Sequence, residues 1–350
     1  MAENVNTISS QVGGIAQELI TELSGKNQIF SKRVIDNIFA FVGLAGGVGT
    51  STIVANVAKS LSKKGFSVVI IDLNICSPVQ HIYYKSEQKA KKPDLVSLLS
   101  GENKLGESLE LKDGVSLLYA NNRILFDKVV MDSPGTSANF ASILEQLSSL
   151  YDVVLLDVPA HGELAFEITN IALFKADYMI AVMDENVGCI GSYNRLERNL
   201  SYVGISTQHI RVIMNKRTNI TYPTSVFKQL GIELDVLIPY ELSVVESGLR
   251  GNIYIEKGAS SAVTATQFLE AIDELRDVIL KLGGYEDKKM AAIAENKERK
   301  AQAAQAKAEA KAEAKAEAKS QKQKGKKGFG KKSKEEEVDE IQDVNDDDEY

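Results

Sequence analysis

The chain of 350 residues has no tryptophan, two cysteines, six prolines and three histidines. Cys76 and Cys189 lie far apart, and two such thiols neither form a disulfide framework nor match the ligand spacing of a metal site. No apolar run approaches the ~20 residues that a membrane-spanning helix needs. The first residues lack the basic region, apolar core and cleavage site of a secretory signal, so the sequence predicts a cytoplasmic protein.

A surplus of positive charge is also missing. The formal net charge of -7 does not favour a general nucleic-acid-binding surface, so nucleic acid is not an expected partner. The hydrophobic content of 44% is that of an ordinary globular protein and is sufficient for a large core. Partners therefore have to be inferred from motifs.

Three regions of the chain differ in pattern. Residues 1–37 carry apolar side chains at helical spacing, which predicts a short amphipathic helix followed by a linker. Residues 38–284 alternate short apolar runs with amphipathic segments, beginning with IFAFVG, TSTIVANVAKSLSKK and FSVVIID. This alternation predicts one α/β domain with a mostly parallel sheet and helices on both faces. Ligands of such sheets bind beyond the carboxyl ends of the strands.

The remaining residues, 285–350, are rich in Ala, Lys, Glu and Gln and have no apolar periodicity. They predict a low-complexity charged tail that is helical or disordered. The tail is either a solubilising arm, which we favour, or a tether to a charged partner. Its Lys-rich stretch at 322–334 predicts at most a weak peripheral contact with anionic lipid.

A glycine-rich stretch follows the first predicted strand and leads directly into a helix. Glycines let the backbone turn its N–H groups inward, and the start of a helix adds partial positive charge, so this arrangement can hold a phosphate group. The alternative, a glycine-rich turn without a ligand, is disfavoured by the strand-loop-helix context. The predicted phosphate-binding residues are Gly46, Gly47, Val48, Gly49, Thr50, Ser51 and Thr52.

The stretch AGGVGTST resembles the deviant Walker A motif of the MinD/ParA family of P-loop ATPases, which usually reads KGGVGKTT. The resemblance implies a homodimer that binds ATP and Mg²⁺. Ala45 and Thr50 stand where the family has lysines, and Asn74 stands where it has the aspartate that activates water. Neither Ala nor Thr carries charge, and an amide cannot accept the proton as a carboxylate does. The resemblance therefore implies weakened binding of ATP and Mg²⁺, weak or absent hydrolysis, and no retained catalytic residue.

The same resemblance assigns further binding residues. Asp72 ends the second family strand and is expected at the nucleotide site. YDVVLLDVPAHG is similar to the Walker B strand, which implies that Asp157 holds Mg²⁺ through water while the Ser51 hydroxyl is a direct ligand. Asn215 matches the residue that contacts adenine, and Pro239 lies in the segment that closes over the base.

Within the family, GGVGTST is most similar to the CpaE/TadZ-type pilus assembly (Flp/Tad) localisation proteins, and the resemblance covers residues 36–281. It implies a dimerising scaffold that positions a pilus or a type II/IV secretion apparatus at the membrane face, with secretion or pilus assembly proteins as partners. The alternative is an active ParA/MinD-like ATPase for DNA partition or cell positioning. A bacterial tyrosine kinase shares the fold, but it needs the P-loop lysine and a C-terminal tyrosine cluster, and only Tyr350 is present there.

Overall fold

The computed structural model describes residues 36–87, 92–121, 134–160, 167–202, 204–218, 224–257 and 262–285. By its internal contacts the chain divides into residues 1–293 and 294–350, and all described residues belong to the first unit. The N-terminal helix expected within residues 1–37 and the charged tail expected over 285–350 lie outside the described residues, apart from their boundary positions. Both stay predictions.

The described residues form one eight-stranded sheet in the order β3-β4-β2-β5-β1-β6-β7-β8. Every neighbouring pair is parallel except β3 and β4, which are antiparallel. The mostly parallel sheet predicted from the apolar runs is therefore confirmed. The strands are β1 (Ile38–Gly43), β2 (Val68–Asp72), β3 (Glu110–Lys112), β4 (Val115–Tyr119), β5 (Val153–Val158), β6 (Tyr178–Met183), β7 (Ile210–Arg217) and β8 (Leu234–Pro239).

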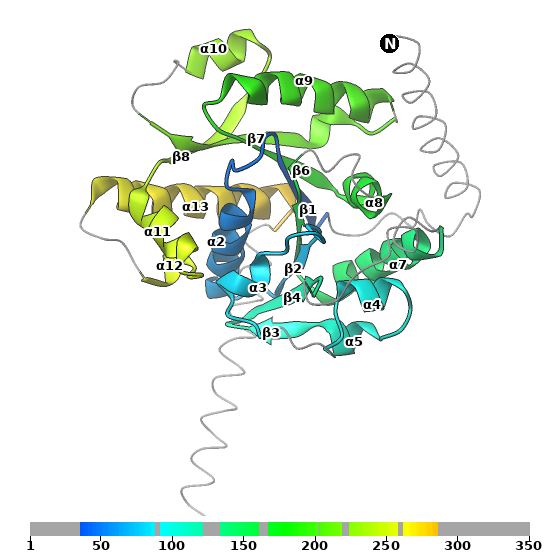
Figure 1. The fold of residues 1–350 in the computed structure, drawn as a ribbon. Coiled ribbons are helices and arrows are strands. Elements are labelled where there is room, and N and C mark those ends of the chain that lie inside the picture. The colour runs from blue at the N-terminus through cyan, green and yellow to red at the C-terminus, as the bar shows by residue number, and fades with distance from the viewer. Residues whose placement is uncertain are drawn as a thin grey trace, which may run out of the picture. The chain divides into compact units, whose positions relative to one another are not determined.

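Helices cover both faces of the sheet. On one face α2 and α13 pack against each other, and on the other α7 packs against α8 (Figure 1). Every residue of β1, β2, β4 and β5 is buried in consequence, which explains why these strands are continuous apolar runs rather than alternating ones. The helices are α2 (Thr50–Lys63), α3 (Gln80–Tyr83), α4 (Leu95–Leu99), α5 (Leu105–Ser108), α7 (Pro134–Leu150), α8 (Glu167–Lys175), α9 (Val187–Tyr202), α10 (Thr224–Gln229), α11 (Leu242–Leu249), α12 (Tyr254–Lys257) and α13 (Val263–Leu282).

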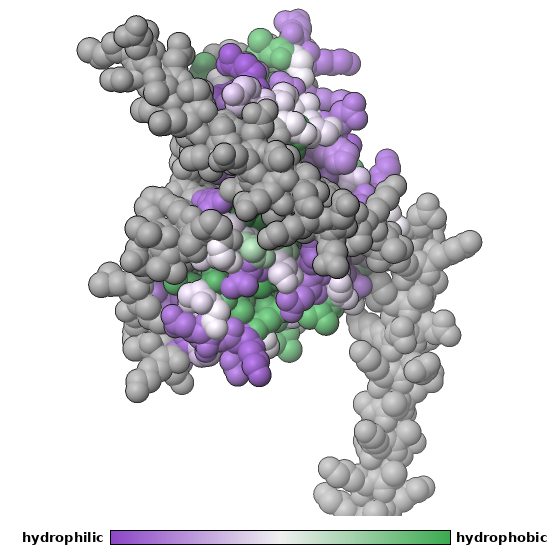
Figure 2. Space-filling view, turned by 90° about the vertical axis from the view of Figure 1, so that its right-hand side faces the viewer, coloured by the Kyte–Doolittle hydropathy of each residue, from purple (hydrophilic) through white to green (hydrophobic). Residues whose placement is uncertain are grey.

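None of the described helices combines the length and the apolar character that a bilayer-spanning helix requires. The side of the molecule that carries α7 and α8 faces the viewer in Figure 2, where hydrophobic and hydrophilic residues are interspersed over the part that is coloured. Apolar surface scattered in this way is ordinary for a globular protein.

The order of the strands determines where a ligand can bind. From β1 the chain crosses to β2 on one side, whereas from β5 it crosses over β1 to β6 on the other side. The connections that leave β1 and β5 thus run in opposite directions, which opens a crevice at the carboxyl ends of these strands. The glycine-rich loop lies at this point, because it follows β1 directly.

The two ends of the described domain meet at the opposite end of the sheet. Asn37, directly before β1, donates through Nδ2 to the carbonyl groups of Ser148 and Tyr151. After α13, the Tyr285 hydroxyl donates to the carbonyl of Asp152, which immediately precedes β5. The domain therefore begins and ends beside the amino ends of its central strands.

Candidate nucleotide site

A cavity of about 710 Å³ opens at the carboxyl ends of the central strands. The glycine-rich loop, the first turn of α2, the ends of β5, β7 and β8, and α11 line it. The structure thus brings together residues that are far apart in the sequence. The sequence-predicted residues among the lining are Gly46, Gly47, Val48, Gly49, Thr50, Ser51, Thr52, Asn74, Asp157, Asn215 and Pro239.

The glycine-rich loop has a backbone shape that side chains would prevent. Gly47 and Gly49 have φ values of 77° and 92°, in the left-handed region that L-residues rarely adopt. A Cβ atom on Gly49 would lie 2.5 Å from Nδ2 of Asn215. That amide donates to the carbonyl of Val48 at 2.8 Å, so β7 is fastened directly to the loop.

The two positions at which the lysines are missing lie at this loop. Ala45 and Thr50 both line the cavity. Thr50 is mostly buried, and a Cβ atom on Gly43 would lie 2.8 Å from its hydroxyl oxygen. Neither side chain brings a charge.

A different cation reaches the loop. Lys216, which follows Asn215 at the end of β7, lines the cavity and donates through Nζ to the carbonyl of Gly47. Sequence reasoning missed this residue. The available signal was a basic residue directly after Asn215, the residue expected to contact adenine.

The residues expected to hold a metal ion are close together. Asp157 is buried at the end of β5, and Gln80 donates through Nε2 both to its Oδ2 at 2.7 Å and to the carbonyl of Ser51 at 3.0 Å. The Oε1 atom of Gln80 is buried and has no hydrogen-bond partner. Gln80 was not predicted from the sequence, because its distance from Asp157 along the chain conceals their contact.

Asp72, which the resemblance assigns to the nucleotide site, is paired in register with Asp157 on the neighbouring strand. It does not line the cavity, and its carboxylate accepts hydrogen bonds from the backbone N–H groups of Asn74, Val79 and Gln80 at 2.8 to 3.1 Å. The carboxylate therefore holds the loop after β2 in place. This loop in turn places Asn74 at the cavity and Gln80 beside Asp157.

Burial raises the pKa values of both Asp72 and Asp157, and for Asp72 the charge of Asp157 adds to the effect. The hydrogen bonds to Asp72, and the contacts of Asp157 with Gln80 and Ser51, act in the opposite direction. The site is thus short of positive charge. Within the described ranges no group of three or more His, Cys, Asp or Glu residues is placed to hold a metal ion, so any metal here would need other oxygen donors.

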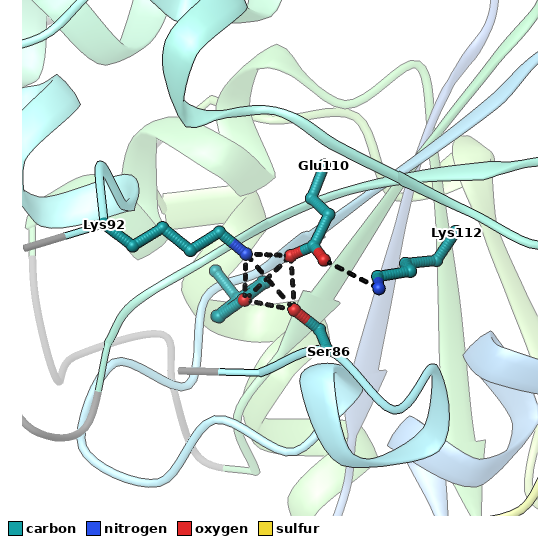
Figure 3. Close-up of polar contacts among 5 residues, drawn as sticks. Ser86, Lys92, Glu110 and Lys112 are labelled. Carbon is teal, nitrogen blue, oxygen red and sulfur yellow. Dashed lines mark hydrogen bonds and ion pairs between the residues drawn. The ribbon is translucent and has the colours of Figure 1, made fainter. Parts of the chain in front are cut away.

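A second polar cluster lies at the edge of the sheet, away from the cavity (Figure 3). Lys92, Ser86 and Lys112 all hydrogen-bond or ion-pair with Glu110, and Tyr119 completes the network. Burial lowers the pKa of Lys92, but the hydrogen bonds to Glu110 and Tyr119 outweigh this and raise it. Although burial raises the pKa of Glu110, the three partners lower it to about 2. Lys92 therefore stays protonated and cannot act as a base toward Ser86, so the cluster fastens the segment after α3 to β3 and β4.

Comparison with known proteins gives a consistent result. Residues 36–204 match a family described as AAA domain. The chain is 24% identical over 225 residues to an uncharacterized ATP-binding protein of Methanocaldococcus jannaschii, covering 59% of this chain and 86% of that one. It is also 24% identical over 235 residues to the septum site-determining protein MinD of Thermotoga maritima, covering 63% and 84% respectively.

Solved structures share the fold. MinD of Pyrococcus horikoshii complexed with Mg-ADP aligns with a TM-score of 0.58 at 20% identity, over 71% of this chain and 98% of that one. A ParA family ATPase of Chlorobium tepidum aligns with a TM-score of 0.57 at 20% identity, over 69% and 98%. The sheet order, the glycine-rich loop and these matches define a P-loop α/β protein. Within that class, the fold is that of the MinD and ParA structures.

Proposed function

We propose that the domain binds an adenine nucleotide with Mg²⁺ in the cavity and hydrolyses ATP slowly or not at all. The observation that supports this proposal is a contrast within one site. The loop backbone, Ser51 and Asp157 are assembled around the cavity, whereas Ala45, Thr50 and Asn74 lack the charges used for hydrolysis. A phosphate cradle made of backbone N–H groups does not depend on those side chains.

The residues present fit a divalent cation. The Ser51 hydroxyl and the Asp157 carboxylate line the cavity and are oxygen donors of the kind that Mg²⁺ prefers. A cation would also favour the charged forms of Asp72 and Asp157, whose pKa values burial raises. When bound with a nucleotide, Mg²⁺ would neutralise charge on the phosphate oxygens.

The missing groups affect hydrolysis more than binding. Loss of one charge-assisted hydrogen bond of about 1.5–3 kcal/mol weakens binding by roughly tenfold to a hundredfold. A cationic group at the transferring phosphate accounts for about a thousandfold or more in rate. The amide of Asn74 cannot take a proton from water in place of a carboxylate. We therefore propose a nucleotide-binding scaffold rather than an efficient ATPase.

We further propose that two copies associate through the cavity face. Ile82, Tyr240 and Leu249 line the cavity and are exposed by 50%, 43% and 85% respectively. Apolar side chains gathered at the mouth of a site are typical of an interaction surface. Leu242, on the same helix as Leu249, is also exposed.

The sequence resemblance suggests which assembly such a scaffold would position. We propose a role in positioning a Flp/Tad-type pilus or a type II/IV secretion apparatus, on the cytoplasmic side of the membrane, with assembly proteins as partners. The alternative is an active MinD/ParA-like ATPase for cell positioning or DNA partition, which the relatives named for septum site determination support. Salt-sensitive gel shifts with nonspecific DNA would favour DNA partition.

The deciding experiment is calorimetric titration of the full chain with ATP and ADP in the presence of Mg²⁺, followed by turnover on the same sample. Binding with turnover far below that of an active relative supports the scaffold. Rapid turnover that is abolished by Asp157→Asn contradicts it. No heat with either nucleotide would mean that the cavity serves another ligand.

A further inference from the structure

We propose that Lys216 supplies, from β7, the positive charge that the glycine-rich loop lacks, and that its ammonium group contacts the phosphates of the bound nucleotide. This inference rests on the proposed nucleotide site. It assigns the role of phosphate contact to a residue outside the loop, in place of the lysines missing at Ala45 and Thr50.

The position of Lys216 is the first support. Its Nζ donates to the carbonyl of Gly47, and its Cε lies 3.7 Å from where a Cβ atom of Gly49 would be. The side chain therefore lies along the loop whose N–H groups would hold phosphate. A bound phosphate group would be a stronger partner for the ammonium group than a neutral carbonyl, because the hydrogen bond would then join opposite charges.

The backbone of Lys216 is the second support. Its φ value is 56°, in the left-handed region, which is uncommon for a residue other than glycine. The register between β7 and β8 shifts between Met214 and Arg217. Lys216 lies within this irregularity and is not paired with a residue of β8. Strained backbone of this kind tends to occur where a side chain has to be directed at a site.

The charge around the cavity is the third support. Among the described residues that line it, Lys216 is the only Lys or Arg, whereas Asp157 and Glu241 are acidic. Glu241 already accepts hydrogen bonds from the backbone N–H and hydroxyl of Ser243 and from the Thr264 hydroxyl. The described part of the chain places no carboxylate within ion-pair distance of Lys216. Its charge is available to a ligand.

The test compares Lys216→Met, which keeps most of the aliphatic stem, with Lys216→Arg, which keeps the charge. Lys228→Met, on α10 and away from the cavity lining, is the matched control. Each variant is titrated with ATP and Mg²⁺, and with adenosine, which has no phosphate. We expect Lys216→Met to lose about tenfold or more in affinity for ATP, the effect of one charged contact. Affinity for adenosine should stay within about twofold, and the Arg and Lys228 variants should stay near wild type.

If Lys216 only held the loop in shape, Lys216→Met would lower the affinity for adenosine and for ATP by the same factor. That result would overturn the inference. An unchanged ATP affinity in a folded Lys216→Met variant would do the same. Thr50→Lys added to Lys216→Met should restore ATP affinity, since it returns a cation to the loop. If the wild-type chain binds neither ATP nor ADP, the proposed function itself is wrong. The titration of the wild type therefore distinguishes failure of the proposed function from failure of the role assigned to Lys216.

Discussion

Asp72 and Asp157 are paired in register on the neighbouring strands β2 and β5, and both carboxyl groups are buried. Three backbone N–H groups hold Asp72, whereas the side chains of Gln80 and Ser51 hydrogen-bond to Asp157. The first carboxylate therefore organises a loop, and the second faces the cavity. Two buried acids so placed make the metal-free site electrostatically unfavourable.

Asp157→Asn is expected to raise the free energy of unfolding of the metal-free protein at neutral pH. It removes the charge of a buried carboxyl group, and each unit by which burial raises a pKa corresponds to about 1.4 kcal/mol. Urea denaturation with and without Mg²⁺ measures the effect, and Mg²⁺ should stabilise the wild type but not the variant. Glu102→Gln, at an exposed carboxylate, is the control and should change little. A destabilised Asp157→Asn protein would contradict the electrostatic account.

The same pair predicts how stability depends on pH. Both pKa values are raised above the ordinary 3.8, so the folded state retains protons that the unfolded chain loses. The free energy of unfolding of the metal-free protein should therefore decrease as pH rises above about 4. This slope should be smaller in Asp157→Asn and smaller at saturating Mg²⁺. Denaturation midpoints measured from pH 5 to pH 8 provide the comparison.

Glu110→Gln should have the opposite pH behaviour. The pKa of Glu110 is lowered from 4.5 to about 2, so its stabilising contribution is complete above pH 4.5 and is lost as pH falls toward 2. At pH 7 the variant should be about 1–3 kcal/mol less stable, because Lys92 loses its charged partner. Near pH 2.5 the difference from wild type should become small. An equal loss at both pH values would show that packing, rather than charge, holds this cluster together.

Two glycines of the loop offer a matched pair. Gly49→Ala should cost about 1–3 kcal/mol and weaken nucleotide binding, because its φ is 92° and the new Cβ would lie 2.5 Å from the Asn215 amide. Gly46→Ala should be tolerated in stability, since no atom lies within 4 Å of its Cβ position. Thermal unfolding and calorimetric titration of both variants measure the difference. Equal effects would mean that the steric account of the loop is wrong.

The apolar mouth of the cavity can be tested by self-association. Leu249→Ser should weaken any dimer that forms with ATP and Mg²⁺, because an 85% exposed leucine at the rim would lose its contacts in the interface. Leu111→Ser, at a 71% exposed position on β3, is the control. Sedimentation velocity over a concentration series measures both. Identical sedimentation of the two variants would place the interface elsewhere.

The main features of the fold could be predicted from the sequence because the central strands are continuous apolar runs between amphipathic helices. β3 could not, since three residues from Glu110 to Lys112 give too short a pattern to recognise. In the site, the order of the strands alone brings Asp157 and Asn215 to the glycine-rich loop. Lys216 was missed because its direction depends on a local irregularity in β7. Gln80 was missed because the path of its loop depends on how Asp72 is hydrogen-bonded.

The meeting of the two ends of the domain has a practical consequence. A Cβ atom on Gly283 would lie 3.0 Å from the carbonyl oxygen of Asp36, so the first and last described segments are neighbours at the amino end of the sheet. A short peptide joining residue 285 to residue 36 would close this domain into a ring without crossing the cavity. The chain could then be reopened at a surface turn to make a circular permutant. Fluorescent labels fused at either end of the domain would lie at the amino ends of the strands, opposite the cavity. They would leave the phosphate loop accessible.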